Sequence, residues 1–96
     1  MPKYEIRSGD RAEFIAGLRE LADFLTANPI VLVPRCASFG VFVDGADSTA
    51  RREGTEYVAA PLGVPVKDIG EGYYDARRIF GSIAYSVIAI PPEERQ

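Results

Sequence analysis

The first regular pattern along the chain is a helical repeat of hydrophobic residues between positions 10 and 28. Apolar residues three or four positions apart lie on one face of a helix. Asp10, with Glu13 three residues later, has the arrangement of a capping box, and Asn28-Pro29 is a stop signal. We therefore expect a helix from Asp10 to Asn28. Its apolar positions are Phe14, Ile15, Leu18, Leu21, Ala22 and Leu25.

An alternating pattern marks the expected strands. Apolar residues at every second position predict a strand over residues 39–43. Before it, a short apolar run at residues 30–33 lies between two prolines, which predicts either an extended connector or a short edge strand. Glycine-containing turns divide the C-terminal third, because glycine reaches the positive φ of tight turns. The strands expected there are residues 66–69, 73–80 and 83–90.

A second helix is expected over residues 49–60. Asp47 or Ser48 can cap its start through a side-chain oxygen. Pro61 lacks a backbone donor and should end the helix at the residue before it, with Gly63 as a C-terminal cap.

The expected elements follow the order α-β-α-β-β-β. This order indicates an α+β two-layer sandwich, with two helices on one face of a mainly antiparallel four-stranded sheet. The length of 96 residues fits a single domain over residues 1–96, with an ordered core of about 10–91 and a frayed tail at 93–96. The expected core residues are Phe14, Leu18, Leu21, Leu25, Phe39, Val41, Val43, Val58 and Leu62.

The composition removes much of the usual catalytic chemistry. The chain has no histidine and a single cysteine, Cys36. Histidine is the usual general base and a common metal ligand, so we expect no catalytic residue, no metal and no cofactor. Cys36 has no histidine to activate it and is interpreted as a partly buried structural cysteine.

Charge and hydropathy bear on location and partners. The net charge is −3 without a basic cluster, which argues against nucleic-acid binding. No apolar stretch approaches the ~18 residues of a membrane span, and no secretory signal is visible at the start. A lone cysteine also agrees with a reducing compartment, so we expect a cytoplasmic protein with no membrane contact.

The strand at residues 73–80 carries two candidate sites on its two faces. Tyr74 and Arg78 share the more apolar face, which should line the core. Arg78 then either binds an anion or carboxylate together with Tyr74, or makes a structural bond to a nearby loop.

The outward face of the same strand is the candidate interaction surface. Tyr73 and Arg77 lie on it, and they would form an aromatic-apolar patch with Tyr85 and Val87 if those also point outward. The rest of this patch would come from Phe42.

The pair Arg51-Arg52 lies near the start of the second helix, where positive charge is unfavourable. It either contacts an acidic partner or a phosphate, or it is solvated and balanced by Glu53 and Glu56, which is the preferred interpretation.

Four segments together resemble a known type of protein. These are residues 14–29, 39–43, 59–64 and 85–91. The chain resembles a group of small uncharacterised single-domain proteins of actinobacteria and their phages. The resemblance implies a fold and no assigned activity, and a phage setting favours a small protein that binds another protein.

Two classes of function remain after these exclusions. The leading hypothesis is a non-enzymatic cytoplasmic protein-interaction module, either a homodimer or a binder of another protein such as a host protein. The alternative is a small hydrolase or an anion- or ligand-binding domain that uses Arg78 and Tyr74. Nucleic-acid binding is the least favoured.

Overall fold

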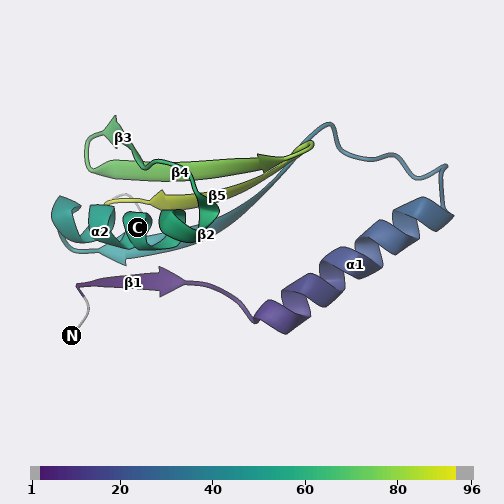
Figure 1. Cartoon of the computed structure of the whole chain (residues 1–96), viewed down its shortest axis with the longest axis horizontal. Helices are drawn as coiled ribbons and strands as arrows, with labels where there is room; N and C mark the ends of the chain where they lie inside the picture. Colours follow the sequence, from purple (N-terminus) through teal and green to yellow (C-terminus); the bar gives the residue numbers. More distant parts are fainter. Residues whose placement is uncertain (1–2, 93–96) are drawn as a thin grey trace.

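The computed structural model describes residues 3–92 and has two helices and five strands (Figure 1). The predicted tail at 93–96 lies outside the described residues. The α+β class is confirmed. The elements are β1 (Tyr4–Arg7), α1 (Arg11–Ala27), β2 (Ala37–Gly45), α2 (Ser48–Leu62), β3 (Lys67–Gly70), β4 (Tyr73–Phe80) and β5 (Ile83–Ala89).

The sheet has five strands in the order β1-β2-β5-β4-β3. Its two central strands, β2 and β5, run parallel, and the other three pairs are antiparallel. The predicted number of four strands is therefore wrong, since the sheet has five; three of its four strand pairs are antiparallel, and the parallel central pair makes it a mixed sheet. The missed strand, β1, has an apolar–polar alternation of only four residues and pairs with a partner far along the chain.

The helix α2 covers one face of the sheet. Asp47 caps its start by accepting a hydrogen bond from the Ala50 amide at 2.8 Å. The helix continues through Pro61 to Leu62, so the expected end at Ala60 is wrong. Gly63, at φ 71°, closes the last turn by donating to the carbonyls of Ala59 and Ala60.

Strand register fixes which residues share the face under α2. Val43 pairs with Ala89, and Val87 pairs with Ala76, so these side chains lie on one face. Within the described residues this face holds the buried apolar cluster. Its members are Val43, Ala59, Tyr74, Ala76, Val87 and Ala89.

The helix α1 has the expected bounds but not the expected packing. Asp10 accepts from the Glu13 amide at 2.8 Å, and the Asn28 side chain donates to the Phe24 carbonyl at 2.8 Å. Figure 1 shows the helix projecting away from the body formed by α2 and the sheet. None of its residues is buried, so the prediction of two helices on one sheet face is wrong.

The expected core list is corrected in the same way. Phe14 and Leu21 are 46% and 53% exposed, and Leu18 is exposed as well. Val43 is buried as expected. The remaining five are half-buried: Leu25, Phe39, Val41, Val58 and Leu62.

Residues 28–36 connect α1 to β2 without forming a helix or strand. Of the two predicted alternatives, an extended connector and a short edge strand, the structure therefore has the connector. Its apolar side chains stand in solvent. Ile30 is 90% exposed and Leu32 is 92% exposed. The connector thus adds exposed apolar side chains directly after α1 in the chain.

Arg51 is buried, contrary to its interpretation as a solvated residue. It is 6% exposed, with Nε donating to the Gly72 carbonyl at 2.9 Å and Nη1 to the Gly45 carbonyl at 3.0 Å. It therefore joins the end of β2 to the turn between β3 and β4. Arg52, in contrast, is exposed and lies 3.4 Å from the Glu56 carboxylate.

The substitution Arg51→Met is expected to lower the free energy of unfolding by about 1–3 kcal/mol, because two carbonyls would lose their donor. Arg52→Met removes the same charge from an exposed ion pair and should change it by less than about 0.5 kcal/mol. Urea denaturation of both variants measures the difference. Equal effects would show that Arg51 is not a structural tie.

Gly54 is where α2 comes closest to the sheet. A Cβ at this position would lie 2.5 Å from Val43 Cγ1 and 2.8 Å from Tyr4 Cδ1. Although alanine favours a helix over glycine by about 1 kcal/mol, overpacking here should outweigh that gain.

We expect Gly54→Ala to destabilise the protein by about 1–3 kcal/mol. Glu53→Ala, at the exposed neighbouring position, should change stability by less than about 0.5 kcal/mol. Thermal denaturation followed by circular dichroism compares the two. A stabilised Gly54→Ala variant would contradict the close approach.

Candidate interaction surface

The apolar face of α1 is the first part of the candidate surface. Four large side chains of this helix are exposed although their spacing is that of a buried helix face. The helix carries charged residues on its other sides, including Arg19 and Asp23. The exposed apolar residues are Phe14, Leu18, Leu21 and Phe24.

The second part is a region of the sheet that α2 does not cover. Beyond the buried cluster, the same face continues toward the turn between β4 and β5, and Figure 1 shows these strands extending past α2. Every residue here is exposed or half-buried. We call this region the open half of the sheet; its residues are Phe39, Arg78, Phe80, Ile83 and Tyr85.

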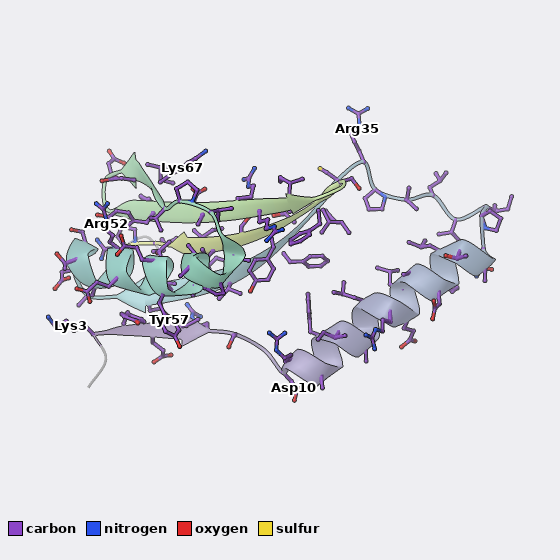
Figure 2. The ribbon with its side chains drawn as sticks, in the orientation of Figure 1. Lys3, Asp10, Arg35, Arg52, Tyr57 and Lys67 are labelled. Carbon is purple, nitrogen blue, oxygen red and sulfur yellow. The ribbon has the colours of Figure 1, made fainter. Side chains whose placement is uncertain are left out.

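A shallow groove of about 610 Å³ separates α1 from the sheet. The Phe14 and Phe39 rings meet across it edge to face, with centroids 5.4 Å apart. Figure 2 shows side chains from the helix and from the sheet pointing into this space. The groove is lined by Gly9, Asp10, Glu13, Phe14, Gly17, Leu18, Leu21 and Phe39.

The four residues of the predicted outward patch do not share a face. Arg77 pairs with Ser86, which is the neighbour of Val87 in β5 and therefore points to the other face of the sheet. Tyr73 and Arg77 thus lie on the face opposite α2. Tyr85 and Val87 lie on the α2 face, and Val87 is 0% exposed. The sequence could not decide this, because β5 is apolar on both faces.

The face opposite α2 keeps part of that patch. Tyr73 and Arg77 share it with Phe42 and Ile79, both of which are exposed. The hydroxyl of Ser86 is buried at its centre and has no hydrogen-bond partner among the described residues. Asp75 also lies on this face.

Tyr74 and Arg78 lie on one face, as expected, but do not form a pocket together. Tyr74 is 7% exposed and belongs to the core under α2. Arg78 is exposed and donates from Nη1 to the Leu62 carbonyl at 3.2 Å, with its guanidinium 5.1 Å from the Phe80 ring centroid. These contacts correspond to the structural-bond alternative for Arg78, which ties β4 to the end of α2.

Other candidate chemistry is sparse in the part of the chain that the structure describes. Cys36 is exposed, so its interpretation as a partly buried residue is wrong. Among residues 3–92, no cluster of three or more potential ligand side chains could hold a metal ion. In the same residues, no helix has the length and hydropathy needed to cross a membrane.

The exposure of α1 leads to a stability prediction. Leu21→Ala should lower the free energy of unfolding of the monomeric chain by less than about 1 kcal/mol, because the side chain is half exposed already. Val43→Ala, in the core, should cost about 2 kcal/mol. Urea denaturation in dilute solution measures both. If Leu21→Ala lowered the free energy of unfolding by about 2–5 kcal/mol in this dilute solution, α1 would have to pack on the sheet of its own chain.

Comparison of the chain with known proteins gives no match to a protein family, to a curated protein or to a solved structure. The resemblance to small actinobacterial and phage proteins therefore stays a prediction, and the candidate surface depends on the geometry alone.

Proposed function

We propose that the chain is a non-enzymatic, cytoplasmic protein-interaction module. Its contact surface consists of the apolar face of α1, the connector at residues 28–36 and the open half of the sheet. The partner is a polypeptide, either another protein such as a host protein or a second copy of the chain.

The observation that carries this proposal is the unpartnered apolar face of α1. Most helical stability in proteins comes from burying an apolar face rather than from helix propensity. The 17 residues of α1 form a helix with its apolar face exposed. Exposed apolar side chains gathered on α1 and in the connector that follows it are typical of a site for another macromolecule.

The chemistry of the groove supports a polypeptide partner over a small substrate. Its lining is mainly apolar, with Asp10 and Glu13 as the charged members. Asp10 is already engaged as the cap of α1. Aromatic residues and arginine, which dominate contact energies between proteins, are present in the adjoining open half as Phe39, Tyr85 and Arg78.

Site-specific photo-crosslinking tests the proposal. A benzoylphenylalanine at Leu21 should give covalent adducts with protein in cells of the organism that encodes the chain. The same group at Ala16, on the opposite side of α1, should give markedly fewer. If neither position forms a protein adduct, or both do so equally, the interaction surface is not where we propose it.

A further inference from the structure

We infer that the partner of this surface is a second copy of the chain. In the symmetric dimer that we propose, α1 of each copy lies in the groove of the other, against that copy's α1 and the open half of its sheet, and the connector at residues 28–36 belongs to the same contact. The inference rests on the proposed function and assigns its partner.

The exposed apolar area matches what a dimer of this size needs. With roughly 150 Å² for each large side chain, the exposed fractions of the large apolar residues on α1 and the open half correspond to about 420 Å² per copy, and those in the connector to about 430 Å². Stable interfaces bury about 800 Å² per partner. One copy therefore offers enough apolar surface for a specific contact.

The two surfaces have opposite charges. The groove is lined by two carboxylates, Asp10 and Glu13, and by no basic residue. The open half of the sheet contains Arg78 and no carboxylate, whereas Arg77 lies on the opposite face. In the dimer, the acidic helix of one copy lies beside the basic open half of the other's sheet, twice by symmetry.

The groove has room for a second helix. Gly17 is part of its lining, and a Cβ built there meets no atom within 4 Å. A glycine on an apolar helix face lets another backbone come close. This explains a residue that otherwise weakens α1 by about 1 kcal/mol.

In the structure, the sheet of the same copy does not cover the apolar face of α1. It meets α1 near the start of the helix, where Phe14 contacts Phe39. Farther along, Leu21 and Phe24 remain about half exposed. These residues face open space that the helix of a second copy can occupy.

Sedimentation equilibrium of the full chain, from about 1 to about 200 μM, tests the dimer. We expect the mass to rise toward twice 10.5 kDa, with a dissociation constant in the micromolar range. The double variant Leu18→Glu/Leu21→Glu should raise that constant at least ~100-fold. Ala12→Glu/Ala16→Glu adds the same two charges on the opposite side of α1 and should raise it less than ~5-fold.

A second variant, Tyr85→Glu, probes the other half of the contact. It alters the open half of the sheet without touching α1, and should also raise the dissociation constant by ~100-fold or more. Amide hydrogen exchange of β2, β4 and β5 reports whether each variant keeps its folded core.

Three outcomes would overturn the dimer. The first is a wild-type chain that is monomeric at every concentration. The second is an Ala12→Glu/Ala16→Glu variant whose dimer dissociates as readily as that of the leucine variant. The third is a Tyr85→Glu variant that keeps both its folded core and its dimer. If the wild type is monomeric but Leu21 crosslinks to a different protein, the proposed function stands and the second copy is ruled out. If Leu21 gives no adduct either, both proposals fail.

Discussion

The limited reach of α2 is the constraint on which the rest of the structure depends. Its 15 residues span about 22 Å, whereas the nine residues of β2 span about 30 Å. Because α2 starts directly after the end of β2, its cover begins at that end of the sheet and runs out before the other. The open half of the sheet is the geometric result of this mismatch.

The covered half is held together by close contacts. The small residues Gly54 and Ala59 let α2 approach the sheet, while Arg51 links two backbone carbonyls from different strand ends. None of these contacts involves α1. The covered half of the sheet is therefore held together without the first helix, and these contacts do not fix the position of α1.

The features that could be predicted from the sequence are the local ones. The cap at Asp10, the cap at Gly63 and the glycine turns each depend on residues close together in the chain. The burial of Arg51 depends on Gly45 and Gly72 at other strand ends, so no local pattern signals it. The periodicity of α1 correctly identifies its apolar face, but periodicity does not specify what covers a face.

The connectivity of α1 has an evolutionary consequence. The helix and its connector lie between β1 and β2, which are hydrogen-bonded neighbours in the sheet. This inserted segment can therefore change in length, sequence or direction while the strands on either side keep their pairing. Related chains could acquire a different binding preference by altering this insertion alone, with the body of the domain inherited unchanged.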